Sequence, residues 1–310
     1  MNAEQQSPKV LIDARNFQKP LGDLATTVAL KVEREGPKLL TTAKFVAVDI
    51  YVMIRQAQSI YDLFFFLNAD ERRKKDVNWR VAYSAAVLPL VRCMIDCLYN
   101  ITVLLDDAET NGPQFRQSGY NQSLRALKAD EERYGGDPKW DGYIAERRNT
   151  INFLMRVDGM TLEDVVNAKT WPTLSGYLRV KKNVPLTSHQ QFLKTLTLGF
   201  WKEYSGMAHA TFQGLLPTAL FYTENDIPYQ DREHFETITV ETMISLNIFR
   251  VAAILLCILT EVQARFAFDG ASINKRLHQI WKALLPAQEI KELYDERYAQ
   301  LMKDKGIDPD

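Results

Sequence analysis

Residues 41–68, TTAKFVAVDIYVMIRQAQSIYDLFFFLN, repeat apolar side chains at steps of three and four. The apolar positions are Val46, Ile50, Met53, Ala57, Ile60 and Phe64. Polar side chains follow the same period on another face, at Tyr51, Arg55, Gln58 and Asp62. Such steps return to one face of a helix that has 3.6 residues per turn. The stretch therefore predicts an amphipathic helix with one face in a core.

Similar patterns predict three more long helices, over residues 79–106, 190–222 and 236–267. Shorter helices are expected over 117–133, 140–156 and 161–169, and a last one over 286–303. No segment sustains the strict polar–apolar alternation that is typical of strands. The predicted fold class is all-α: a bundle of four long helices with a helical insertion between the second and third, plus a C-terminal helix.

The chain is expected to divide into three parts. Residues 1–40 form a partly ordered N-terminal segment, 41–267 the bundle and 268–310 a C-terminal helical extension. The insertion spans 107–189 and is expected to pack on the bundle. Turn signals such as Asn111-Gly112-Pro113 mark it.

Composition is that of an ordinary globular protein. The 310 residues are 46% hydrophobic, and 38 basic against 39 acidic side chains give a net charge of −1. This balance removes the electrostatic case for a dedicated nucleic-acid-binding or polybasic membrane protein, while a local basic patch stays open. The three cysteines, Cys93, Cys97 and Cys257, lie in apolar stretches and are too few for a disulfide framework. With no secretory signal at the N-terminus, these features favour a cytoplasmic location.

Two segments approach the length of a membrane span. Residues 244–260 contain Asn247 and Arg250, and residues 81–105 contain Arg92 and Asp96 near their middle. A charge at the centre of a bilayer costs about 2.5–3.5 kcal/mol. We therefore expect buried helices of a bundle and no membrane span.

Standard chemical motifs are mostly absent. The sequence has no glycine-rich phosphate loop, dinucleotide fingerprint, His-Glu-x-x-His or nucleophile elbow. A carboxylate-bridged di-iron bundle needs Glu-x-x-His pairs, and none of the four histidines has a glutamate three residues before it. We therefore expect neither a cofactor nor a metal.

Polar side chains interrupt the apolar helices at helical spacing. Ser84, Arg92, Asp96 and Asn100 follow one row, and Lys202, Ser205, His209 and Gln213 follow another. Arg92 and Asp96 can pair across one turn. If the two rows meet with Arg250 in the bundle centre, they form a buried polar cluster. The candidate catalytic residues are Arg92, Asp96, Ser205 and His209.

Two interpretations of this cluster stay open. A buried Arg–Asp pair closed by serine and histidine can fix the register and orientation of helices. The same surroundings can shift the imidazole pKa toward a range that is useful for acid–base chemistry. Solvent access distinguishes the two, because a cleft that reaches His209 favours an enzyme and full occlusion favours a structural role.

Arg92-Cys-Met-Ile-Asp96 and Tyr204-Ser-Gly-Met-Ala-His209 together resemble an uncharacterised group of bacterial helical proteins. That group pairs an Arg-x-x-x-acid helix with a Tyr-x-x-Ser-x-x-x-His-like helix. The resemblance covers roughly residues 40–265. It implies a helical fold and the candidate residues above, and it implies no particular reaction.

A weaker resemblance is to HEPN-type helical ribonucleases of bacterial defence systems. Their signature places an arginine four to six residues before a histidine; here Lys202 stands seven before His209. The resemblance implies RNA cleavage with His209 as acid or base. Arg92 or Arg250 would then stabilise the charge that develops on phosphate.

The sequence thus supports two hypotheses about function. The first is a non-catalytic, regulatory or defence-associated protein with a structural polar core. The second is a HEPN-like ribonuclease, and only this one makes RNA a partner. Other partners are unknown, and long apolar helix faces leave a homodimer open.

Overall fold

The computed structural model describes residues 17–40, 43–69, 77–179, 185–211, 214, 246–268 and 270–307. These residues form helices and connecting turns, and no strand occurs among them. The predicted all-α class is confirmed.

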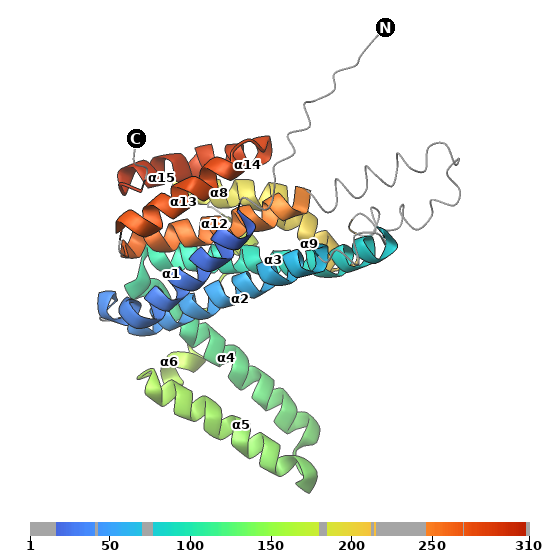
Figure 1. Ribbon diagram of the computed structural model, residues 1–310. Coiled ribbons are helices and arrows are strands. Elements are labelled where there is room, and N and C mark those ends of the chain that lie inside the picture. Colours follow the sequence, from blue (N-terminus) through green and yellow to red (C-terminus); the bar gives the residue numbers. More distant parts are fainter. Residues whose placement is uncertain are drawn as a thin grey trace.

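Four long helices form the centre of the molecule (Figure 1). They are α1 (Gln18–Leu39), α2 (Lys44–Ala69), α3 (Val77–Asp106) and α12 (Leu246–Phe266). Helix α12 packs against each of the other three, and its residues from Arg250 to Ala264 are all buried. This explains why its sequence is apolar over most of its surface, while its buried polar side chains make hydrogen bonds within the fold, as Arg250, Thr260 and Gln263 do.

Helix α1 lies outside the predicted bundle boundary at residue 41. Its residues Leu21, Leu24, Val28 and Val32 are fully buried at helical spacing. The N-terminal segment therefore contributes a core helix, which the sequence interpretation missed. Residues 1–16 lie outside the described part of the chain.

The predicted helix over 190–222 is shorter and interrupted. It consists of α8 (Ser188–Leu196), a π-helical turn (Thr197–Trp201) and α9 (Lys202–Ala208). After α9, Ala210 adopts a left-handed φ of 49°, and the amides of Ala210 and Thr211 bond to the carbonyls of Met207 and Gly206. This is the Schellman arrangement that ends a helix. Residues 215–245, which include the rest of this prediction and the start of the fourth helix, lie outside the described residues.

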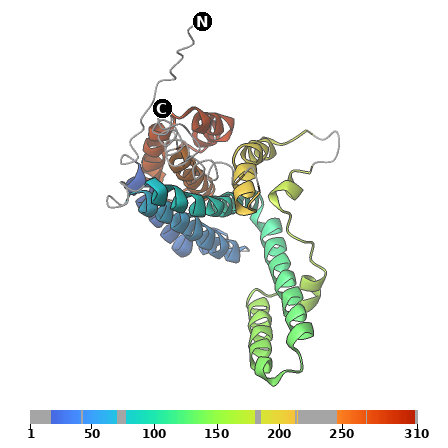
Figure 2. The ribbon, with the colours of Figure 1, turned by 90° about the vertical axis from the view of Figure 1, so that its right-hand side faces the viewer.

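The insertion forms an arm that projects from the bundle (Figures 1 and 2). Helices α4 (Ala108–Tyr134), α5 (Pro138–Val157) and α6 (Leu162–Val166) correspond to the three predicted short helices. They enclose a small core of their own. The expectation that this region packs on the bundle is therefore wrong for most of its length.

The predicted turn at Asn111-Gly112-Pro113 is also wrong, because these residues lie inside α4. Asp107 caps this helix by accepting from the Thr110 amide. Gly112 lies where α4 crosses α2, and a Cβ there would approach Val46 Cγ2 to 2.4 Å. The glycine thus serves close packing of two helices and does not mark a turn.

The C-terminal part covers α12. It comprises α13 (Gly270–Leu284), α14 (Gln288–Leu293), a π-helical turn (Tyr294–Tyr298) and α15 (Ala299–Asp304). The last three correspond to the helix predicted over 286–303. The linking segment of the arm carries one further short helix, α7 (Leu174–Tyr177).

Two helical stretches, Ala86–Asp106 and Leu246–Phe266, are long and apolar enough to cross a membrane by length and composition. Their most apolar windows are 67% and 83% buried within the fold. Core helices of a helical bundle have the same character. The expectation that the chain has no membrane span stays a prediction.

Candidate functional site

Arg92 on α3 is the centre of the candidate site. Its Nη1 lies 2.8 Å from His209 Nε2, and its guanidinium stands 5.0 Å from the centre of the Trp201 ring. Arginine only donates hydrogen bonds, so His209 Nε2 accepts this one.

Asp96 lies one helical turn after Arg92. Its Oδ1 accepts a hydrogen bond from Trp201 Nε1 at 3.1 Å, while its Oδ2 is 3.8 Å from Arg92 Nε. Burial raises the pKa of Asp96, and the Trp201 hydrogen bond and the Arg92 charge offset part of this increase. The carboxylate is thus held by an indole N–H more closely than by the arginine.

The π-helical turn Thr197–Trp201 presents two aromatic rings to two arginines. Phe200 is buried beneath Arg250, with 5.1 Å between guanidinium carbon and ring centre, and Trp201 lies beneath Arg92. A π-helical turn inserts an extra residue into a helix and often occurs at functional sites. Here it places the Phe200 ring against Arg250 of α12 and the Trp201 ring against Arg92 of α3.

The structure brings three of the four predicted site residues together, at the surface. The side chains of Arg92 and Asp96 are 26% and 43% exposed, and His209 is exposed at the end of α9. The prediction of a polar cluster in the bundle centre is therefore wrong. The reason is that α9 ends at Ala208, so His209 lies at a helix terminus and not along a buried face.

Ser205 lies one turn before His209. Its carbonyl accepts the His209 backbone amide at 3.0 Å, and its hydroxyl has no hydrogen-bond partner among the described residues. Lys202 is exposed. The side chains of Ser84 and Gln213 lie outside the described part of the chain.

Arg250 belongs to a separate network. It donates to both carboxylate oxygens of Glu289, at 3.0 and 2.8 Å, and to Glu203 at 2.9 Å. Next to it, the Tyr204 hydroxyl donates to Asn247 Oδ1. The predicted meeting of Arg250 with the His209 row does not occur, because two glutamates surround this arginine.

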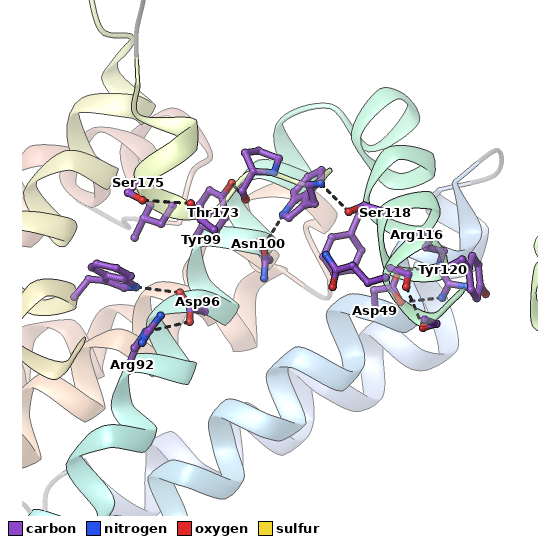
Figure 3. A pocket seen from close by; sticks show the side chains of 18 of the residues that line it. Asp49, Arg92, Asp96, Tyr99, Asn100, Arg116, Ser118, Tyr120, Thr173 and Ser175 are labelled. Carbon is purple, nitrogen blue, oxygen red and sulfur yellow. Dashed lines mark hydrogen bonds and ion pairs between the residues drawn. The ribbon is translucent and has the colours of Figure 1, made fainter. Parts of the chain in front are cut away.

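A cleft of about 830 Å³ opens beside Arg92 and Asp96. Its walls come from α3, the first half of α4, the segment Trp171–Ser175 and Trp201, with Asp49 of α2 and Leu154 of α5. Figure 3 shows Arg92 and Asp96 at one end of the cleft and Arg116 with Asp49 at the other. This volume is within the range of small-molecule binding pockets.

Trp171 holds the segment that closes one wall of the cleft. Its Nε1 donates to Asn100 Oδ1 at 2.8 Å, and its amide donates to Ser118 Oγ at 2.7 Å. The Tyr99 hydroxyl donates to the carbonyl of Pro172 at 2.8 Å. Sequence reasoning missed this wall. The only signal was an isolated tryptophan in the turn-rich stretch Trp171-Pro-Thr-Leu-Ser-Gly176.

Arg116 is the other cation of the cleft, and carboxylates surround it. It donates to both oxygens of Asp49 at 2.8 Å and also to Asp158, which accepts from the Tyr120 hydroxyl as well. Burial raises the pKa of Asp49, and the bonds to Arg116 offset part of this effect. Arg116 therefore has few donors left for a ligand.

Among the described residues, no three His, Cys, Asp or Glu side chains are grouped as a metal site would require. The side chains that the cleft offers to a ligand include Arg92, Asp96 and the aromatic walls, and His209 bonds to Arg92. No protein-family model, curated protein or solved structure matches this chain.

Proposed function

We propose that this chain is a non-catalytic, regulatory protein of the cytoplasm that binds a phosphodiester-containing ligand in the cleft, with Arg92 on the phosphate. One observation carries the proposal. Arg92 lines the cleft and makes its hydrogen bond to the ring of His209, with Asp96 no closer than 3.8 Å, whereas Arg116 donates to two carboxylates. A guanidinium whose donors are not taken by carboxylates is suited to a phosphate.

Among phosphate ligands, the charge balance of the cleft favours one that carries a single negative charge over one that carries two. Arg116 with Asp49 and Asp158 leaves a net negative charge, and Asp96 lies close to Arg92. A terminal phosphate carries about −1.5 to −2 charges at neutral pH and would be repelled by these carboxylates. A phosphodiester carries one charge. It is therefore the better match.

The aromatic walls supply the rest of the recognition. Tyr99, Phe115, Trp171 and Trp201 all line the cleft. Stacking of a base on an aromatic side chain contributes about 1–3 kcal/mol. One available arginine and a few rings suit a short ligand, which agrees with a net charge of only −1 for the whole chain.

Binding is tested with the dinucleoside monophosphate of deoxyadenosine, which has no 2′-hydroxyl and is not cleaved through one. Titration calorimetry compares it with deoxyadenosine, which lacks the phosphate. We expect the dinucleotide to bind more tightly to the wild-type protein. Arg92→Gln weakens this binding at least tenfold, since a charged hydrogen bond contributes about 1.5–3 kcal/mol.

The matched control is Arg265→Gln, an exposed arginine at the end of α12, which leaves affinity unchanged. Equal affinities of the wild-type protein for the dinucleotide and the nucleoside would contradict the proposal. So would equal affinities of Arg92→Gln and the wild-type protein for the dinucleotide.

A second candidate function is RNA cleavage, and the exposure of His209 beside Arg92 favours it. The 2′-oxygen of RNA would attack phosphorus and the 5′-oxygen would leave, producing a 2′,3′-cyclic phosphate. A base removes the 2′-proton and an acid protonates the 5′-oxygen, roles open to His209 and Asp96. Arg92 would stabilise the charge on the phosphate.

Incubation of adenylyl-adenosine with the purified protein separates the two functions. Binding without product supports the non-catalytic proposal. Product formation that disappears in His209→Ala supports the ribonuclease. Because His209 is exposed, the fold is expected to survive this substitution, which circular dichroism checks.

A further inference from the structure

Trp171 fixes the orientation of the Asn100 amide in the cleft. The indole Nε1–H donates to Asn100 Oδ1 at 2.8 Å, so the amide oxygen lies on the side of Trp171 and the amide nitrogen on the other side. Asn100 Nδ2 has no hydrogen-bond partner among the described residues. Asn100 lines the cleft, and it therefore offers a ligand its two N–H donors.

Asp96 offers acceptors one helical turn before Asn100. Its Oδ1 accepts one hydrogen bond, from Trp201 Nε1, and its Oδ2 is 3.8 Å from Arg92 Nε, beyond hydrogen-bond distance. An ionised carboxylate has about four lone-pair sites. Both oxygens of Asp96 therefore have lone pairs left for the donors of a ligand.

Arg92, Asp96 and Asn100 form one row along the cleft. They follow each other at steps of four on α3, a spacing at which Cβ atoms are about 5–6 Å apart. Figure 3 shows them in this order, with Arg92 at the end of the cleft. The row consists of a cation, a carboxylate and an amide donor. A matching ligand carries an anion, then a pair of donors, then an acceptor.

Guanine has these donors and this acceptor along one edge. Its 2-amino group and N1–H are neighbouring donors, and O6 is the acceptor next to them. We propose that the cleft binds a guanine base, whose 2-amino group and N1–H donate to the two oxygens of Asp96 while Asn100 Nδ2 donates to O6. The inference rests on the proposed function, which places the phosphate on Arg92, one turn before Asp96.

The other bases match the row less well. Asparagine commonly binds adenine through both its amide oxygen and its amide nitrogen, but Asn100 Oδ1 is already bonded to Trp171. Adenine and cytosine each present one amino group next to a ring acceptor, so one carboxylate oxygen of Asp96 gains no donor. Thymine has no amino group. Guanine alone supplies two neighbouring donors to the carboxylate.

Titration calorimetry of the full chain with four dinucleoside monophosphates tests the base preference. Their bases are guanine, hypoxanthine, adenine and cytosine, all on deoxyribose. Hypoxanthine lacks only the 2-amino group of guanine and is the matched control. We expect the guanine ligand to bind at least tenfold more tightly than the hypoxanthine ligand, since one hydrogen bond to a charged group has this effect. Equal affinities for these two, or tighter binding of the adenine or cytosine ligand, would overturn the inference.

Substitution of Asp96 tests the same contact from the side of the protein. In Asp96→Asn the amide oxygen accepts from Trp201 and the new N–H groups face the donors of guanine, so the preference over hypoxanthine should be lost. Asp106→Asn makes the same change of charge at the exposed end of α3, outside the cleft, and should keep the preference. Circular dichroism checks that both variants fold. A preference that survives in Asp96→Asn would contradict the inference.

Nucleosides separate this inference from the proposed function. Deoxyguanosine and deoxyinosine carry no phosphate, so the difference between their affinities measures recognition of the base alone. A preference for deoxyguanosine without any gain from a phosphate would support the guanine site and contradict the role proposed for Arg92. Dinucleotides that bind through Arg92 whether or not the 2-amino group is present would support that role and overturn the guanine site. If none of these ligands bound, both proposals would be wrong.

Discussion

Two arginines stand over neighbouring rings of the same π-helical turn, and their surroundings differ. Arg250, over Phe200, is 10% exposed and makes three hydrogen bonds to the carboxylates of Glu203 and Glu289. Arg92, over Trp201, is 26% exposed and bonds to the ring of His209. The aromatic support is shared. The difference lies in how far carboxylates neutralise each cation.

This difference distinguishes Arg250, which holds helices together, from Arg92, which is placed to bind a ligand. Arg250 joins α12 to α9 and α14, so its hydrogen bonds link three helices. Removing one member of such a network leaves charged partners unsatisfied. Arg92 joins α3 to the end of α9 and faces the cleft, and its carboxylate neighbour Asp96 lies 3.8 Å away and keeps its hydrogen bond from Trp201 when Arg92 is replaced.

The largest expected effect comes from substituting the two arginines separately. Arg250→Gln should lower the free energy of unfolding by about 1.5–3 kcal/mol, because a largely buried guanidinium loses its charged hydrogen bonds while its two carboxylates, 42% and 35% exposed, stay partly solvated. Arg92→Gln should lower it by less than about 1 kcal/mol, as exposed pairs do. Urea unfolding at pH 7 measures both. Losses of equal size would show that the two arginines do not differ in role.

A smaller effect is expected at the ring beneath Arg92. Trp201→Phe keeps an aromatic face but removes the Nε1–H that binds Asp96 at 3.1 Å. We expect a loss of about 1 kcal/mol in unfolding free energy, which is typical of one hydrogen bond. Trp140→Phe on the arm is the control, because its indole N–H has no hydrogen-bond partner among the described residues. If Trp140→Phe lowered the unfolding free energy by as much, the Trp201–Asp96 hydrogen bond would not explain the loss in Trp201→Phe.

The sequence predicted the all-α class and most of the helices, because apolar steps of three and four are a local signal. It did not predict where helices end. Gly112-Pro113 suggested a turn, yet Gly112 allows α4 to approach Val46 on α2. The end of α9 at Ala210 carries no glycine, so the usual signal was missing. The first error concerns a contact with a residue distant in the chain, and the second a local backbone conformation that alanine rarely adopts.

The site was predictable in part. The pairing of Arg92 with Asp96 follows from helical spacing, and the meeting of Arg92 with His209 was anticipated as two rows that face each other. The sequence did not predict that Arg250 lies apart from Arg92 and His209. Its partners Glu203 and Glu289 come from elements whose packing the sequence does not reveal. Nor did any pattern place Trp171 over Asn100.

The helix end that presents His209 offers a stabilising substitution. Ala210 has a left-handed φ of 49°, a conformation that glycine adopts without strain. Ala210→Gly should therefore raise the free energy of unfolding by roughly 0.5 kcal/mol. Ala208→Gly, inside the last turn of α9, should lower it by a similar amount. If both variants were destabilised, strain at residue 210 would not be what distinguishes this helix end.

The smallest expected effect is a change with pH at Asp96. Burial raises its pKa above 3.8, so between that value and the raised one the folded protein holds more protons than the unfolded chain. The contribution of Asp96 to stability is therefore present at low pH and is lost as the pH rises through the raised pKa. Asparagine does not ionise, so Asp96→Asn does not suffer this loss. The unfolding free energy of the variant minus that of the wild-type protein should therefore increase with pH over that interval and then level off. Asp107→Asn is the control with the opposite sign, since hydrogen bonds from Thr110 lower the pKa of Asp107. A pH-independent difference for Asp96→Asn would mean that Arg92 and Trp201 fully compensate the burial of this carboxylate, and Arg92 would then be neutralised much as Arg250 is.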